Sequence, residues 1–125
     1  MHENEIATEI VDSCFHIHKE LGPDLLESVY EGILCFELHR KGLTFSRQQP
    51  IPVIWKELKL EFGFRMDILV ENKVIVEIKS VENLNPVYMK ILLTYLKLAD
   101  KRLGLLVNFN ETLIKEGIHR VVDRL

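Results

Sequence analysis

Asp67, Glu77 and Lys79 lie on two neighbouring segments that have the composition of β-strands. Asp67 falls in residues 59–71, and the other two fall in residues 73–80. Only a short turn separates the segments, which is typical of an antiparallel hairpin. Two carboxylates and an ammonium group on paired strands are groups that can bind a divalent cation and act on a phosphate ester.

The register of this hairpin decides whether these side chains meet. A hairpin centred on Asn72 places Asp67 directly opposite Glu77, and Arg65 opposite Lys79. Side chains alternate along a strand, so all four share one face of the sheet. The same face also carries Leu69 and Ile75, and the opposite face is a predicted core surface made of Met66, Ile68, Val70, Val74, Val76 and Ile78.

Two facing carboxylates repel each other and destabilise a sheet. A divalent cation such as Mg²⁺ or Mn²⁺ reverses the sign of this interaction, because it binds to carboxylates together with waters and phosphate oxygens. Lys79 points the same way and can approach a scissile phosphate. The alternative is a solvated patch in which Lys79 and Arg65 merely neutralise the two acids, and the spacing by itself leaves both interpretations open.

The order of the other elements predicts an α/β fold. Helical spacing of apolar residues is followed by β-rich segments, then by another helix and a last strand, which predicts a mixed sheet covered by helices on both faces. Asp24 is the expected N-cap of the second helix, and Asn85-Pro86 is the expected start of the third. The expected helices are residues 4–20, 24–41 and 86–99, the expected strands are 50–56, 59–71, 73–80 and 103–109, and the tail 117–125 can add a short strand.

Composition excludes several classes of protein. With 47% apolar and 28% charged residues, the 125-residue chain has the size and composition of one globular domain, spanning residues 1–125. No apolar run has the length of a membrane helix, and the N-terminus lacks the pattern of a signal peptide. A cytoplasmic protein with Cys14 and Cys35 as reduced thiols is therefore expected. The net charge of −3 argues against tight, nonspecific binding to nucleic acid.

The residues that carry the predicted site also carry a resemblance. Asp67, followed after nine residues by Glu77-Ile78-Lys79, resembles the signature of the PD-(D/E)xK nucleases. More specifically, the chain is similar to the small prokaryotic GxxExxY proteins over nearly its whole length. The stretches that match are Leu21-Gly22-Pro23, Leu25-Leu26-Glu27-Ser28-Val29-Tyr30-Glu31, Gln48 with Pro50-Ile51-Pro52-Val53, Arg65-Met66-Asp67-Ile68-Leu69-Val70, Val76-Glu77-Ile78-Lys79, Leu92-Leu93-Thr94-Tyr95-Leu96-Lys97 and Gly104-Leu105-Leu106-Val107-Asn108-Phe109.

This resemblance implies a restriction-endonuclease-like core with a mixed sheet of about four to five strands, and a metal-dependent nuclease activity that leaves a 5′-phosphate. Asp67 and Glu77 would be ligands of Mg²⁺ or Mn²⁺, and Lys79 would assist catalysis. Glu27 would be the helix acid that joins the metal ligands. Glu27 also suits a capping box with Asp24 as the N-cap, and the two roles are compatible.

Two positions depart from the family's pattern. Asp24 stands where the family motif opens with glycine, and Ile91 stands where the third helix has a polar residue. Isoleucine neither donates nor accepts a hydrogen bond. Either Lys90 or Tyr88 takes over that role, or the protein is a weakened or inactive relative.

Three functions follow from these observations. The first is a metal-dependent nuclease that acts on DNA or RNA. The second is a binding module for nucleic acid or protein in which the metal site is residual, which the net charge and Ile91 favour. The third is a homodimer that pairs through the first helix or the edge strand, and this is compatible with the first.

Overall fold

The computed structural model describes the backbone of residues 1–125 and every side chain except that of Phe62. Its five strands form a single sheet in the order β1-β2-β3-β4-β5, in which β3 and β4 are parallel and the other neighbours are antiparallel. This mixed sheet confirms the predicted fold class. The elements are α1 (Glu3–Leu21), α2 (Glu27–Arg40), β1 (Phe45–Trp55), β2 (Leu58–Val70), β3 (Val74–Lys79), α3 (Val87–Ala99), β4 (Leu103–Asn108), the 3₁₀ turn η1 (Ile114–Glu116) and β5 (Ile118–Val122).

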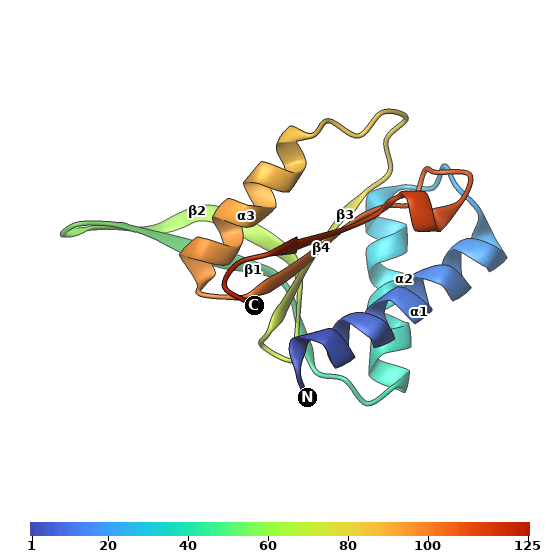
Figure 1. Cartoon of the computed structure of the whole chain (residues 1–125), viewed down its shortest axis with the longest axis horizontal. Coiled ribbons are helices and arrows are strands. Elements are labelled where there is room, and N and C mark those ends of the chain that lie inside the picture. The colour runs from blue at the N-terminus through green and yellow to red at the C-terminus, as the bar shows by residue number, and fades with distance from the viewer.

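Helices cover both faces of the sheet, as expected. In Figure 1, α1 and α2 lie together on one face, α3 crosses the other, and the paired ends of β1 and β2 project beyond the body. The larger core packs α1 and α2 against residues such as Ile68, Val76 and Val107. The smaller core packs Leu92 and Leu96 of α3 on the other face. No helix in the described part of the chain is both long and apolar enough to cross a bilayer.

The first two helices begin differently. In α1, His2 and Glu5 form a capping box, because the ring of His2 accepts from the backbone of Asn4 and the carboxylate of Glu5 accepts from the backbone of His2. In α2 the N-cap is Leu26, which makes no side-chain cap bond. The prediction that Asp24 caps this helix is wrong, because Asp24 has a φ of 74° in the preceding loop.

The predicted register between β2 and β3 is confirmed where the strands pair. Ile68 faces Val76, Leu69 faces Ile75 and Val70 faces Val74. The pairing stops at Ile68, so the ladder contains neither the predicted pair of Asp67 with Glu77 nor that of Arg65 with Lys79. Arg65 pairs instead with Pro50 of β1. The first strand also starts five residues earlier than predicted, at Phe45, and its prolines are tolerated because β1 is an edge strand.

The alternation of side chains breaks at Asp67. Ile68 belongs to the core under α1 and α2, as predicted, but Met66 packs with Leu69 and Ile75 in the core under α3. The prediction that Met66 shares a face with Ile68 is therefore wrong. In β1, Gln48 lies level with this break and has a φ of 52°. The alternation of side chains between the two faces of the sheet is therefore reversed in β1 and β2 at Gln48 and Asp67.

A close approach sets the position of α3 on the sheet. A Cβ at Gly104 in β4 would lie 2.8 Å from a methyl group of Leu92. Because glycine has no side chain, α3 sits low over β3 and β4. Residues one turn on either side of Leu92 therefore reach the region of Glu77. The helix α3 begins at Val87 with Pro86 as its N-cap, one residue later than predicted, although the side chain of Asn85 accepts a hydrogen bond of 2.9 Å from the backbone of Val87.

Candidate metal and catalytic site

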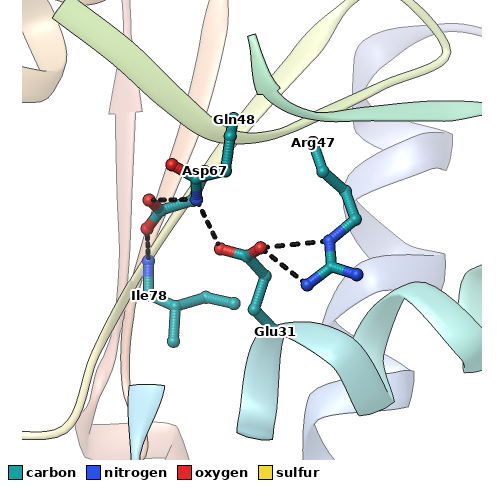
Figure 2. A network of polar contacts seen from close by, with 5 residues as sticks. All are labelled: Glu31, Arg47, Gln48, Asp67 and Ile78. Atoms are coloured by element: carbon teal, nitrogen blue, oxygen red, sulfur yellow. Dashed lines mark hydrogen bonds and ion pairs between the residues drawn. The ribbon is translucent and has the colours of Figure 1, made fainter. Parts of the chain in front are cut away.

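Asp67 lies where β2 separates from β3, and its carboxylate bridges the gap. Oδ2 accepts a hydrogen bond of 2.8 Å from the backbone N–H of Ile78 (Figure 2). The carboxylate thus takes the place of a backbone partner at the point where the ladder ends. This contact fixes Asp67 beside the strand that carries Glu77, as the sequence predicted.

Glu77 is a buried carboxylate with few hydrogen-bond or charge partners to replace the hydration that it has lost. Its side chain has only 8% of its surface exposed, and Oε1 accepts a long hydrogen bond of 3.4 Å from the backbone N–H of Asp67. Burial raises the pKa of Glu77 to about 9, the charge of Asp67 adds to the increase, and Lys79 offsets only part of it. The two acids therefore favour a shared proton or a bound cation over two free charges.

Glu31 of α2 reaches the same region from the other side and is fully paired. Its Oε2 accepts hydrogen bonds of 3.1 and 2.9 Å from Nε and Nη2 of Arg47. Its Oε1 accepts a hydrogen bond of 2.9 Å from Nε2 of Gln48, and the same nitrogen lies 3.3 Å from Oδ1 of Asp67. Figure 2 shows this chain of contacts from Arg47 through Glu31 and Gln48 to Asp67.

Lys79 ends β3 and lies between the acids and α3. Its ammonium group lies 4.2 Å from the centre of the Tyr88 ring, which is the geometry of a cation–π contact. The backbone carbonyl of Lys79 accepts a hydrogen bond of 2.9 Å from the N–H of Phe109. The strand end is thus fixed by β4, while the side chain is held by an aromatic ring.

A small cavity of about 90 Å³ opens beside these groups, between β3 and α3. Ile91 lines it at the position where the GxxExxY resemblance implies a polar residue, and Tyr88 lines it one turn earlier. Tyr95 closes the far side, and burial raises the pKa of its hydroxyl, with the charges of Glu77 and Asp67 contributing. The full lining is Glu77, Lys79, Tyr88, Ile91, Leu92, Tyr95 and Leu106.

Lys90 and Tyr88 are the two candidates to take over the role of the polar side chain that is missing at Ile91. Tyr88 contacts Lys79 directly, as its ring lies under the ammonium group. Lys90 is exposed, and its backbone carbonyl accepts a hydrogen bond from Thr94 within α3. The structure therefore favours Tyr88 over Lys90.

Glu27 is placed apart from the two strand acids. It is the first residue of α2 and is exposed, and no side-chain hydrogen bond or ion pair involves it among the described residues. The capping box predicted for Glu27 is not formed, because the N-cap is Leu26. Glu31, one turn further along the same face of the helix, is the acid that contacts the network of Asp67.

Aromatic and amide side chains hold α2 and the end of β4 in place behind the site. The rings of Tyr30 and Phe109 stack with their centres 4.2 Å apart, and the hydroxyl of Tyr30 donates to the carbonyl of Gly22. The buried side chain of Asn108 binds both backbone groups of Val81, just beyond Lys79. Tyr30 is therefore a packing residue whose hydroxyl is hydrogen-bonded.

The donor groups at this site suit a hard divalent cation. Asp67 and Glu77 supply carboxylate oxygens next to each other, and burial, together with the charge of Asp67, raises the pKa of Glu77 because its anion is poorly compensated within the chain. Magnesium commonly binds proteins through one or two carboxylates and fills its other positions with waters or substrate phosphates. Within the described side chains, no group of three or more His, Cys, Asp and Glu residues gathers to form a complete cage.

Comparison with known proteins places the chain in a family. A family model described as the PD-(D/E)XK nuclease superfamily matches residues 4–121. The match covers nearly the whole chain, and the chain belongs to this superfamily. The resemblance drawn from the motif is thereby confirmed at the level of the superfamily, and the narrower GxxExxY assignment stays a prediction. Searches of curated proteins and of solved structures found no match.

Sequence reasoning missed Glu31 and Gln48 as parts of the site. Glu31 had a detectable signal, because it shares the buried face of α2 with Leu34 and Leu38 at helical spacing. A charged residue in such a position needs a partner. Gln48 was among the residues that carry the family resemblance, but its contacts depend on a left-handed backbone conformation that the sequence does not specify.

Proposed function

We propose that this protein is a divalent-metal-dependent nuclease that hydrolyses phosphodiester bonds of DNA or RNA. The observation that carries the proposal is that Asp67 lies beside Glu77, a buried carboxylate whose charge is only partly compensated, with Lys79 nearby. The chain also belongs to a superfamily of nucleases. Asp67 and Glu77 would hold Mg²⁺ or Mn²⁺. The cation would supply Lewis-acid activation of a water and offset charge at the phosphorus.

The residues around the metal ligands have defined tasks in this proposal. Lys79 presents an ammonium group beside Glu77, where it can stabilise negative charge on the phosphate or assist the attacking water. The ring of Tyr88 restricts Lys79 to this position. Glu27, at the exposed start of α2, stays a candidate for a metal contact only through a rearrangement of that helix end.

A nucleic acid is the proposed partner, despite the net charge of −3. Arg47 and Arg65 lie exposed on β1 and β2 at the edge of the site. Arg65, together with Lys79, can contact phosphates on either side of the one that reacts, whereas Arg47 is held by Glu31. Binding carried by so few cations should weaken with salt, but with a modest slope.

Thermal unfolding with metal tests this proposal most directly. Millimolar Mg²⁺ or Mn²⁺ should raise the unfolding midpoint of the wild type, because a ligand that binds only the folded state stabilises it. The midpoint of Asp67→Asn should not respond. Cleavage of DNA and RNA substrates should follow the same pattern and stop in excess EDTA. A midpoint that ignores metal in the wild type would refute the catalytic assignment.

A binding module that has lost catalysis is the second candidate. The observation that favours it is Ile91, which lines the cavity beside Glu77 and Lys79 where a polar group is expected. In this case the wild type would bind nucleic acid in a salt-sensitive manner without cleaving it. Restoring the polar residue with Ile91→Gln would then create or increase metal-dependent cleavage.

A homodimer is a further proposal about partners. The tip of the β1–β2 hairpin exposes Ile54, Trp55 and Leu58, with 64%, 68% and 54% of their surfaces accessible. Apolar side chains on a projecting edge suit contact with a second copy. The molar mass in solution, compared between the wild type and Trp55→Ser, tests this proposal.

A cytoplasmic location completes the proposal. Cys14 and Cys35 are buried and unpaired, which suits a reducing compartment. Burial raises the pKa of the Cys14 thiol to about 12, so neither metal binding nor nucleophilic chemistry is assigned to it.

A further inference from the structure

Gln48 makes contacts that its place in the chain does not require. Its amide nitrogen donates to Oε1 of Glu31 at 2.9 Å and lies 3.3 Å from Oδ1 of Asp67. A primary amide has two N–H donors, so each carboxylate can take one (Figure 2). One side chain therefore connects the buried acid of α2 to the acid of β2.

The backbone of Gln48 is held in an unusual conformation. Its φ of 52° falls in the left-handed region, within a β-strand and at a residue with a long side chain. Such a conformation costs free energy and persists only where the surroundings maintain it. A chain selected only for stability would favour glycine or asparagine at this position, and glutamine has the longer reach.

The contacts around Gln48 explain how the conformation is maintained. Arg47 fixes Glu31 with two hydrogen bonds, the backbone N–H of Ile78 fixes the other oxygen of Asp67, and Nη1 of Arg65 lies 3.4 Å from the carbonyl of Gln48. Both acids are therefore anchored independently of Gln48. The side-chain amide of Gln48 therefore connects two carboxylates that other groups already hold in place. Its remaining effect is to limit rotation of the Asp67 carboxylate.

We infer that Gln48 is a positioning residue for the metal site, which orients Asp67 by tying it to Glu31. This inference rests on the proposed function, in which Asp67 is a metal ligand. Partners that orient metal ligands commonly contribute a factor of about 10–100 to metal affinity. The left-handed backbone is retained because it directs the amide of Gln48 between the two carboxylates.

The test uses Gln48→Gly in the full chain, with Mn²⁺ alone as the probe and binding followed by isothermal titration. Glycine adopts the left-handed conformation without strain, so the metal-free unfolding midpoint should be equal to that of the wild type or higher. The affinity for Mn²⁺ should fall by about 10- to 100-fold. A variant that is at least as stable but binds metal poorly is the expected signature of positioning.

Gln49→Gly is the matched control. Gln49 is the exposed neighbour in the same strand, and its amide accepts a hydrogen bond from Ser46 without contacting either acid. Glycine weakens an ordinary strand position, so this variant should have a lower midpoint and an unchanged Mn²⁺ affinity. Gln48→Asn is a second test, because asparagine tolerates the backbone conformation but is one methylene too short, and it should also bind Mn²⁺ weakly.

The outcomes separate this inference from the proposed function. If Gln48→Gly binds Mn²⁺ as the wild type does, while Asp67→Asn abolishes binding, the positioning role is wrong and the metal site stands. If Gln48→Gly loses stability as Gln49→Gly does, the role of Gln48 is structural and the inference is also wrong. If the wild type itself does not bind Mn²⁺, both the metal site and the positioning role are refuted.

Discussion

Glu31 and Glu77 are equally buried acids on either side of Asp67, yet their surroundings differ. The two residues have 7% and 8% of their surfaces exposed. Glu31 accepts two hydrogen bonds from Arg47 and one from Gln48. Glu77 accepts one long hydrogen bond from a backbone N–H, and burial together with the charge of Asp67 raises its pKa to about 9.

This difference separates a structural acid from a candidate ligand. Burial alone does not distinguish the two, because a buried charge is stable wherever its partners compensate for lost hydration. Glu31 has its compensation within the chain. The charge of Glu77 is compensated only in part, so a cation bound from solution would stabilise Glu77 more than Glu31.

The largest expected effect compares the cations beside the two acids. Lys79→Met should reduce metal-dependent cleavage by about 10²- to 10³-fold, because it removes a charge placed at the reacting phosphate. Arg47→Met should change cleavage by only a few-fold, but it should lower the unfolding free energy by about 1–2 kcal/mol, since Glu31 loses its ion pair. Cleavage rates and thermal unfolding on both variants measure this contrast.

Folding controls decide how that comparison is read. Circular dichroism of Lys79→Met should match the wild type, with a midpoint that changes little. Equal losses of cleavage in both variants would show that Arg47 also acts on the substrate, and the division into a structural and a catalytic side would be wrong.

A pH series in EDTA compares the two acids themselves. The pKa of Glu77 is about 9 in the folded protein and about 4.5 when unperturbed. Stability from its protonated form is therefore complete below about pH 4.5, and it is lost as the pH rises towards 9. The unfolding free energy of the metal-free wild type should fall between pH 5 and pH 8.5, as measured by denaturant titration.

Two variants sharpen the pH experiment. Glu77→Gln cannot ionise, so its unfolding free energy should depend much less on pH in this window. Glu31→Gln should keep the slope of the wild type at a lower overall stability. Added Mg²⁺ should stabilise the wild type more as the pH rises, because the metal competes with the proton on Glu77. A flat profile for the metal-free wild type would contradict the assignment of Glu77 as under-compensated.

The smallest expected effect concerns the ring that holds Lys79. A cation–π contact at a partly exposed site contributes about 0.5–1 kcal/mol, so Tyr88→Leu should slow cleavage by roughly two- to five-fold. Tyr88→Phe keeps the ring and should stay within about twofold of the wild type by the same relation. Single-turnover rates at saturating metal measure this difference. A loss in Tyr88→Phe as large as in Tyr88→Leu would assign the effect to the hydroxyl instead.

Local patterns in the sequence determined most of the fold. The helical spacing of Ile6, Ile10, Cys14 and Ile17 places α1 correctly, since amphipathic periodicity is a property of neighbouring residues. The short turn after β2 fixed the register with β3, because turn geometry and alternation leave few choices. Asp67 and Glu77 were found for this reason, and Lys79 follows from the same strand.

Only the tertiary structure decided how the site is completed. Glu31 meets Asp67 through Gln48, and these residues come from α2, β1 and β2, so their contact depends on how helix and sheet pack. The turnover of the hairpin at Gln48, which moves Met66 to the other core, depends on a backbone angle that no residue pattern specifies. Local periodicity fixes which residues share an element, whereas packing between elements fixes which of those residues meet.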